Sequence, residues 1–249
     1  MIGDKKVICV VPARLKSTRF PNKVLTSIHG KPTLQWIFES ASQCAQFDEI
    51  IFAVDHLQTA QLVESFGANW IMTNPDCLNG TCRLIEVMEK GDIKGDIWVN
   101  WQGDEPFIHS KMIDDLLPEE KLNLADVWTL KKKIVDLEEI DSPSVVKVVT
   151  DHFDRALYFS RSPIPFERES GQYFKHVGLY AYSQEALSQI SSFEESKLEI
   201  QEGLEQLGFL YHGLKIAVFQ TQFETLGIDT PEDLKKAQLF DMNQHFQVS

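Results

Sequence analysis

Several features that would assign this chain to a specialised class are missing from its 249 residues. No apolar run is long enough to span a membrane, and the opening segment Met1–Lys6 carries no signal-peptide pattern. Internal repeats, low-complexity tracts and a domain linker are also missing. These absences lead us to expect a soluble globular protein of the cytoplasm, with no membrane partner.

Positive charge is scarce as well. The chain has 24 Lys and Arg against 37 Asp and Glu, which gives a formal net charge of -13. Nucleic acids and membrane surfaces are bound through extended basic faces, so the acidic balance argues against both as general partners. It does not exclude a small anionic substrate that is held in a local basic pocket.

Cysteine is rare, and its spacing does not match a metal site. The four cysteines are Cys9, Cys44, Cys77 and Cys82. We expect free thiols in a reducing compartment. Cys77 and Cys82 could in principle bridge or bind a metal, but the spacing favours neither.

A basic loop is the most informative segment that is present. The apolar run Val7–Val11 ends at Pro12 and opens into a loop with four cations: Arg14, Lys16, Arg19 and Lys23. Open parallel sheets bind ligands at the carboxyl ends of their strands. A solvated surface loop is the alternative, but the position favours a polyphosphate site.

The first half of the chain alternates strand-like and helical patterns. Apolar runs rich in β-branched and aromatic residues predict four strands, namely Val7–Val11, Ile50–Val54, Trp70–Met72 and Ile97–Trp101. Residues between them recur at helical spacing, as in Leu34, Ile37, Phe38 and Ala41. This order predicts a Rossmann-like α/β fold with a mostly parallel sheet.

The second half has a different character. Four further strand candidates are separated by long polar segments, namely Val145–Val149, Ala156–Phe159, Val177–Tyr182 and Ile216–Phe219. A helical pattern follows from Leu198 to Leu210, and Thr230-Pro231 has the pattern of a helix N-terminus. The run 131–133 of three lysines predicts a solvated strand edge or turn.

Acidic residues follow strands at two places. Asp104 stands in the turn Gln102–Pro106, directly after a predicted strand, and its carboxylate would suit Mg²⁺ together with substrate phosphates. Asp229 precedes a predicted helix, which makes a helix cap the simpler interpretation. Asn79, Gly80 and Thr81 open another helix and suit either a nucleotide contact or a turn with a cap.

Taken in order, these segments resemble the nucleotidyltransferases that make CMP-activated sugar acids. The similarity is greatest to the family of 3-deoxy-manno-octulosonate cytidylyltransferases (CMP-Kdo synthetases). It covers about 10–234, and the segments that carry it are VVPARLKSTRFPNKVL, FAVDH, NGTCR, VNWQGDEP, KVV, ALYFSRSPIP, KHVGLYAY, LEIQEGLEQL and GIDTPEDL.

The resemblance implies a reaction in which CTP and Kdo give CMP-Kdo and diphosphate, for lipopolysaccharide biosynthesis. It implies catalytic roles for Arg14, Lys23 and Asp104, and Mg²⁺ bound by Asp104 and Asp229. The residues implied in CTP binding are Pro12, Ala13, Arg14, Arg19, Lys23, Thr73, Asn79, Gly80, Thr81 and Gln102.

The second half would then bind the sugar acid. The implied contacts are Arg161, His176, Tyr180, Glu202 and Gln206. The resemblance also implies a nucleotide-diphospho-sugar transferase type of sheet with a smaller mixed α+β subdomain, and a homodimer formed through that subdomain. We expect one domain with a CTP-binding half (1–125), a sugar-acid and dimerisation part (126–222), and a last part (223–249) with Asp229 and the C-terminal helix.

The chain departs from the family pattern at several positions. Cys82 replaces an acidic residue, Gly208 replaces an arginine, the usual FPGKPL reads FPNKVL, and the usual ATD reads AVD. These departures leave the sugar acid open between Kdo, an amino-substituted Kdo such as 8-amino-Kdo, and a nonulosonic acid. Two other classes are a metal-dependent glycosyltransferase and a non-catalytic homologue.

Overall fold

The chain folds into two compact units. The computed structural model describes residues 1–16, 20–77 and 79–240. The first unit consists of Met1–Ile113 with Phe223–Ser249, and the second consists of Asp114–Gln222. None of the helices in the described ranges is both long and apolar enough to cross a membrane.

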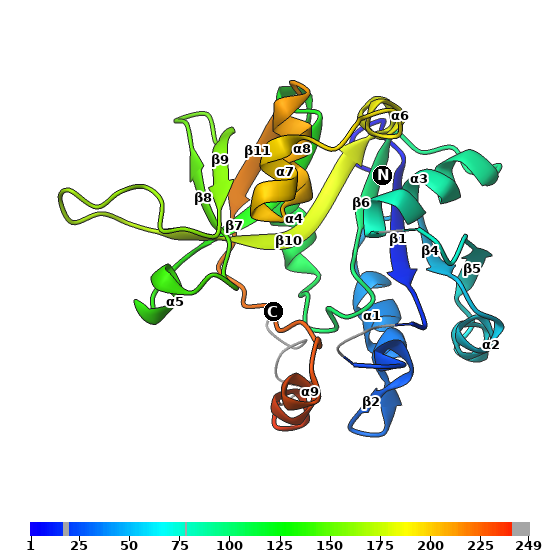
Figure 1. Cartoon of the computed structure of the whole chain (residues 1–249). Coiled ribbons are helices and arrows are strands. Elements are labelled where there is room, and N and C mark those ends of the chain that lie inside the picture. The colour runs from blue at the N-terminus through cyan, green and yellow to red at the C-terminus, as the bar shows by residue number, and fades with distance from the viewer. Residues whose placement is uncertain (17–19, 78, 241–249) are drawn as a thin grey trace. The chain divides into compact units, whose positions relative to one another are not determined.

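A four-stranded parallel sheet forms the centre of the first unit. Its strands, in spatial order, are β6 (Ile97–Asn100), β1 (Val7–Ala13), β4 (Glu49–Val54) and β5 (Asn69–Met72). They lie side by side in the right-hand part of Figure 1. Every residue of β1 is buried, and the strand is paired on both sides. This explains why its sequence is a continuous apolar run.

Helices connect these strands, as the alternating pattern predicts. The elements are the 3₁₀ turn η1 (Lys23–Leu25), the hairpin strands β2 (Ser27–Ile28) and β3 (Lys31–Pro32), and the helices α1 (Thr33–Ala41), α2 (Leu57–Ser65), α3 (Gly80–Lys90) and α9 (Pro231–Gln238). The Asn79 side chain caps α3, and Thr230 with Asp233 forms a capping box on α9. The chain passes into the second unit within α4 (Lys111–Leu116).

The second unit is built on a mixed sheet. Its strands are β7 (Val127–Lys133), β8 (Lys147–Thr150), β9 (Ala156–Ser160), β10 (Phe174–Ser183) and β11 (Ile216–Gln220). β7 pairs in parallel with β11 and antiparallel with β10, and β8 pairs antiparallel with both β10 and β9. The remaining elements are η2 (Glu119–Leu124), α5 (Glu138–Asp141), α6 (Gln184–Ile190), α7 (Lys197–Glu202) and α8 (Glu205–Tyr211). The predicted α/β class is confirmed.

Two local predictions are wrong. The run 131–133 ends β7. Lys131 pairs with both β10 and β11, so the prediction of a sheet edge is wrong there, whereas Lys132 and Lys133 pair with β10 and extend past the last β11 pair. Lys131 is only 7% exposed, and its ammonium donates to Thr150 Oγ1 at 2.8 Å and Asp154 Oδ1 at 3.2 Å. The helical pattern after Leu198 is divided into α7 and α8, because Gly203 adopts a left-handed conformation (φ 62°) that ends α7.

Candidate active site

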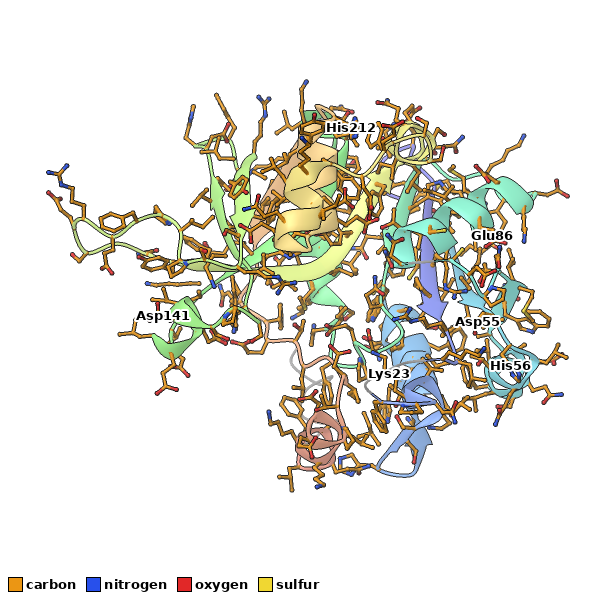
Figure 2. The ribbon with its side chains drawn as sticks, in the orientation of Figure 1. Lys23, Asp55, His56, Glu86, Asp141 and His212 are labelled. Atoms are coloured by element: carbon orange, nitrogen blue, oxygen red, sulfur yellow. The ribbon has the colours of Figure 1, made fainter. Side chains whose placement is uncertain are left out.

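The carboxyl ends of β1 and β6 open onto one cavity in the first unit. Its volume is about 220 Å³, and its lining residues are Pro12, Arg14, Lys23, Val24, Asn79, Gly80, Arg83, Gln102, Gly103 and Asp104. Seven of these are predicted site residues. Figure 2 shows Lys23 near the end at which the arrow of β1 terminates. The cavity therefore lies where the strand-end argument predicts a ligand.

Three other predicted nucleotide residues are buried and are not among the residues that line this cavity. Ala13 is fully buried at the end of β1, and Thr81 is buried in the first turn of α3. Thr73 is also buried, and its hydroxyl donates to Val54 O at 3.0 Å. Arg19 lies outside the described residues.

Two glycines let the backbone approach closely around the cavity. A Cβ at Gly103 would lie 2.5 Å from Pro12 O, a backbone atom that cannot move away as a flexible side chain could. A Cβ at Gly80 would lie 2.7 Å from Gln102 Nε2 and 3.0 Å from Asn100 Nδ2. The position of Gly103 therefore excludes a larger residue, whereas a side chain at Gly80 would displace the amide ends of Gln102 and Asn100.

Lys23 joins the two predicted metal ligands. Its side chain is 9% exposed, and Nζ donates to Asp104 Oδ2 and to Asp229 Oδ1, the latter at 2.8 Å. Asp229 comes from a distant part of the sequence, and Ile228 N donates to Asp104 O at 2.8 Å, which holds the two segments together. Burial disfavours the ammonium charge, but the Asp104 and Asp229 carboxylates outweigh it and raise the pKa of Lys23.

The carboxylate groups of Asp104 and Asp229 suit a magnesium ion as ligands. Two carboxylates converge within hydrogen-bond distance of one ammonium, and Mg²⁺ is bound in proteins by one or two carboxylates plus substrate phosphate oxygens. Three or more His, Cys, Asp or Glu side chains arranged to hold a metal do not occur among the described residues. The protein alone therefore supplies a partial ligand set that phosphate oxygens would complete.

A third carboxyl group, Glu105, was not predicted as a site residue. Its Oε2 is buried and accepts no hydrogen bond from the described part of the chain. Burial, followed by the charges of Asp104 and Asp229, raises the pKa of Glu105 to about 8, although Lys23 opposes the shift. Glu105 is therefore mainly protonated at neutral pH. The only sequence signal that could have identified Glu105 is its position next to Asp104 in the QGDEP motif.

Arg83 is a second residue that the sequence prediction missed. It lines the cavity, yet it is 1% exposed. Its guanidinium donates to Asp55 Oδ2 at 3.0 Å and to Thr73 Oγ1 at 2.6 Å. Asp55 Oδ1 in turn accepts from Leu15 N at 2.8 Å. Arg83 and Asp55 therefore fasten the start of the basic loop to the end of β4.

In the second unit, β10 carries two of the predicted sugar-acid residues. The rings of His176 and Tyr180 are 5.2 Å apart, and His176 Nε2 lies 2.9 Å from Thr129 Oγ1. Burial lowers the pKa of His176 to about 3 and raises that of Tyr180 well above its usual value. Both side chains are therefore neutral at physiological pH.

Arg161 and Glu202 form a second pair in this unit. The Arg161 guanidinium donates to the carbonyl oxygens of Glu202 (2.8 Å), Pro143 (2.9 Å) and Gly203 (3.3 Å). The Glu202 carboxylate accepts from Ser160 Oγ at 2.7 Å and from Arg161 N at 3.0 Å. These bonds fix the plane of the guanidinium. The remaining predicted residue, Gln206, is buried in α8.

Lys147 supports this pair and was not predicted. The residue is fully buried, and its ammonium donates to the carbonyl oxygens of Ser142 (2.9 Å), Val145 (2.7 Å) and Arg161 (2.6 Å). Burial lowers the pKa of Lys147. Three acceptors match the three hydrogens of an ammonium group, so Lys147 ties the 142–145 turn to the backbone of Arg161.

Comparison with known proteins identifies the family of this chain. The family model described as Cytidylyltransferase matches residues 8–216. The chain belongs to the cytidylyltransferase family. It is 45% identical over 236 residues to 3-deoxy-manno-octulosonate cytidylyltransferase of Solibacter usitatus, with 93% of each chain covered, and 43% identical over 248 residues to the enzyme of that name from Pelobacter propionicus, with 93% and 95% covered.

A solved cytidylyltransferase is similar in structure as well. The structure of CMP:2-keto-3-deoxy-manno-octonic acid synthetase complexed with CTP has a TM-score of 0.91 and is 41% identical to this chain. The match covers 97% of this chain and 100% of the other. The cytidylyltransferase fold is therefore present along nearly the whole chain.

One departure from the family pattern has a visible structural consequence in this cytidylyltransferase. A Cβ at Gly208 would lie 2.3 Å from Glu199 Oε2. Glu199 closes the capping box of α7 with Ser196, so its carboxylate fills the space that a side chain at 208 would need. The loss of arginine at this position thus accompanies a close contact between α8 and the first turn of α7.

Proposed function

We propose that this cytidylyltransferase couples CTP to Kdo or a close analogue, releasing diphosphate and supplying CMP-Kdo for lipopolysaccharide biosynthesis. The main support is the cavity whose lining includes Arg14, Lys23 and Asp104, in a fold that matches a CTP-complexed relative along nearly its whole length. The anomeric hydroxyl oxygen attacks the α-phosphorus of CTP, the hydroxyl proton passes to water, and the bond from that phosphorus to the diphosphate oxygen breaks.

The cationic side chains do most of the proposed catalytic work. Arg14 and Lys23 neutralise the charge that develops on the phosphate oxygens and align the triphosphate. Lys23 is positioned for this by its two carboxylate partners. Asp104 and Asp229 would hold Mg²⁺, which supplies Lewis-acid polarisation of the phosphate oxygens.

The sugar acid is proposed to bind in the second unit. The fixed guanidinium of Arg161 offers a planar set of donors to the carboxylate of the sugar. Neutral His176 and Tyr180, together with Glu202 and Gln206, would hydrogen-bond the sugar hydroxyls. A neutral histidine can both donate and accept, which suits a hydroxyl group.

Diphosphate release with CTP, Mg²⁺ and a panel of sugar acids tests the reaction. The panel holds Kdo, 8-amino-Kdo and a nonulosonic acid, and we expect Kdo or its amino analogue to give the highest kcat/KM. Asp104→Asn should abolish release while the circular dichroism spectrum is unchanged, and the exposed Asp92→Asn should retain activity. Normal turnover of Asp104→Asn would remove this residue from the metal site.

Two results would favour other functions. CTP binding without diphosphate release across the panel would indicate a non-catalytic homologue. Consumption of a nucleotide-sugar without any use of CTP would indicate a glycosyltransferase. Arg161→Ala should raise the KM for the sugar acid far more than the KM for CTP, and an equal rise in both would contradict the proposed sugar site.

The proposed enzyme is a cytoplasmic homodimer that associates through the second unit. Exposed apolar side chains in that unit support the dimer, with Phe166 at 89% and Leu157 at 62% exposure. The four cysteines, which all lie within the described residues, form no disulfide, which suits a reducing compartment. Light scattering of the wild type and of Phe166→Asp tests the dimer, and a monomeric wild type would exclude it.

A further inference from the structure

Two thiols lie in contact beside the nucleotide cavity. Cys77 follows β5, and Cys82 lies in the first turn of α3. Cys82 Sγ donates to Cys77 Sγ at 3.0 Å, and Cys77 Sγ donates to Glu86 Oε2 at 3.2 Å. Glu86 lies on α3 (Figure 2). The segment between the two cysteines contains Asn79 and Gly80, which line the cavity.

The other two thiols have different surroundings. Cys9 is fully buried in β1, and its pKa is raised well above the ordinary value by burial. Cys44 Sγ donates to the backbone oxygens of Ser40 and Ser110 at 3.6 and 3.8 Å. Cys77 and Cys82 are thus a pair whose sulfur atoms are in direct contact.

We propose that Cys77 and Cys82 are a reversible oxidation site, at which a hydroperoxide converts the two thiols into a disulfide that weakens CTP binding. The sulfur atoms need to approach by about 1 Å to reach the S–S bond length. The two sulfur atoms are already in contact, so the cross-link requires only a local adjustment at these two side chains.

The reaction proceeds in two balanced steps. The Cys82 sulfur attacks one peroxide oxygen, the O–O bond breaks, and water or an alcohol leaves, which gives a sulfenic acid. The Cys77 sulfur then attacks the Cys82 sulfur, the S–O bond breaks, and the hydroxyl group leaves as water with the Cys77 proton. Two thiols lose two electrons in total, and the peroxide gains them.

The surroundings of the two thiols indicate which of them is oxidised first. Cys82 is partly exposed and Cys77 is buried, so the oxidant meets Cys82 first. Burial, followed by the contacts with Cys82 and Glu86, raises the pKa of Cys77 to about 12, which protects Cys77 from direct oxidation. The short distance between the sulfur atoms promotes the second step despite the small fraction of Cys77 thiolate.

The bond would act on the cavity through Asn79. The Asn79 side chain accepts from Cys82 N at 2.8 Å, so a shift of Cys82 toward Cys77 strains this cap. The effect on CTP rests on the proposed function, whereas formation of the bond does not. Because linkage is reciprocal, bound CTP should in turn slow the oxidation.

The single Asn-Gly sequence of the chain provides a direct test for the bond. Asn79–Gly80 lies between the two cysteines, and hydroxylamine cleaves Asn-Gly bonds. Full-length protein is treated with hydrogen peroxide, alkylated in denaturant and then cleaved. We expect a mass loss of about 2 Da before alkylation, and after cleavage two fragments that separate only upon reduction.

Matched variants control this test. Cys77→Ser and Cys82→Ser should each give fragments that separate without reductant, and Cys44→Ser should behave as the wild type. Separation of the wild-type fragments without reductant would overturn the proposal, as would a gain of about 32 Da at Cys82, which marks a sulfinic acid.

The effect of the disulfide on CTP binding is measured in a separate experiment. The KM for CTP should rise about fivefold on oxidation and return with dithiothreitol, and it should not change in Cys77→Ser. A disulfide that forms without changing this KM would refute the coupling. An enzyme that does not use CTP at all would instead contradict the proposed function and leave the fragment test valid.

Discussion

The buried pair of Arg83 and Asp55 offers a sharp test of how the basic loop is held. The two side chains are 2% and 7% exposed, with 3.0 Å between Nη2 and Oδ2. Asp55→Ala leaves the guanidinium buried without its charge partner, which costs about 3–5 kcal/mol of the free energy of unfolding. It also removes the acceptor of Leu15 N, which costs a further ~1–3 kcal/mol.

Removing both charges should be less damaging than the two single changes added together. In Asp55→Ala/Arg83→Met no unpaired buried charge remains, so the double variant should recover about 2–3 kcal/mol relative to the sum of the single variants. Urea unfolding followed by tryptophan fluorescence measures this, since four of the five tryptophans lie in the first unit.

A more exposed pair in the same unit serves as the control. Lys31 and Glu39 are 29% and 41% exposed, so Glu39→Gln should cost at most about 1 kcal/mol. If the coupling between Asp55 and Arg83 is within the ~0.5 kcal/mol expected for independent sites, the reasoning is refuted. The KM for CTP should rise in Asp55→Ala, because Leu15 N is released at the start of the loop.

Three further outcomes follow from individual contacts. Lys147→Met should raise the KM for the sugar acid about tenfold and leave that for CTP unchanged, whereas Lys131→Met, at a lysine that is also buried, should lower stability without this selective effect. Gly103→Ala should reduce CTP-dependent diphosphate release at least about tenfold, because its Cβ meets Pro12 O, while Gly171→Ala, whose Cβ has a nearest neighbour at 3.8 Å, should be normal. The pKa of His176 is lowered to about 3, so the native state binds fewer protons than the unfolded chain between pH 6.5 and 3, and stability falls as the pH drops through this window. Between pH 7 and 5 the wild type should therefore lose about 2 kcal/mol more than His176→Asn in urea unfolding, and equal losses would contradict a buried neutral histidine.

Much of the first unit could be predicted from local sequence. The four parallel strands and the caps at Asn79 and Thr230 occur where the patterns place them. Hydrophobic period, capping residues and glycine stops act over a few residues, so a single segment contains the information that specifies them. The motif order was sufficient to identify the family.

The second unit was less predictable. The lysines at the end of β7 have the pattern of a surface segment. However, Lys131 is buried between β10 and β11, and Thr150 and Asp154 accept its hydrogen bonds. The helical periodicity from Leu198 continued across Gly203, where the chain turns in the left-handed region. Each error has the same origin, since partners distant in sequence or a single backbone dihedral overrode the local pattern.

The sequence by itself determined the basic loop after β1, the acid after β6, and membership of the cytidylyltransferase family. Only the tertiary structure decided which charges meet. Lys23 lies between Asp104 and Asp229, Glu105 is buried beside them, and the thiols of Cys77 and Cys82 are in contact. The physical reason is that charge pairing and burial depend on distances between segments that are separate in the chain, and only folding sets those distances.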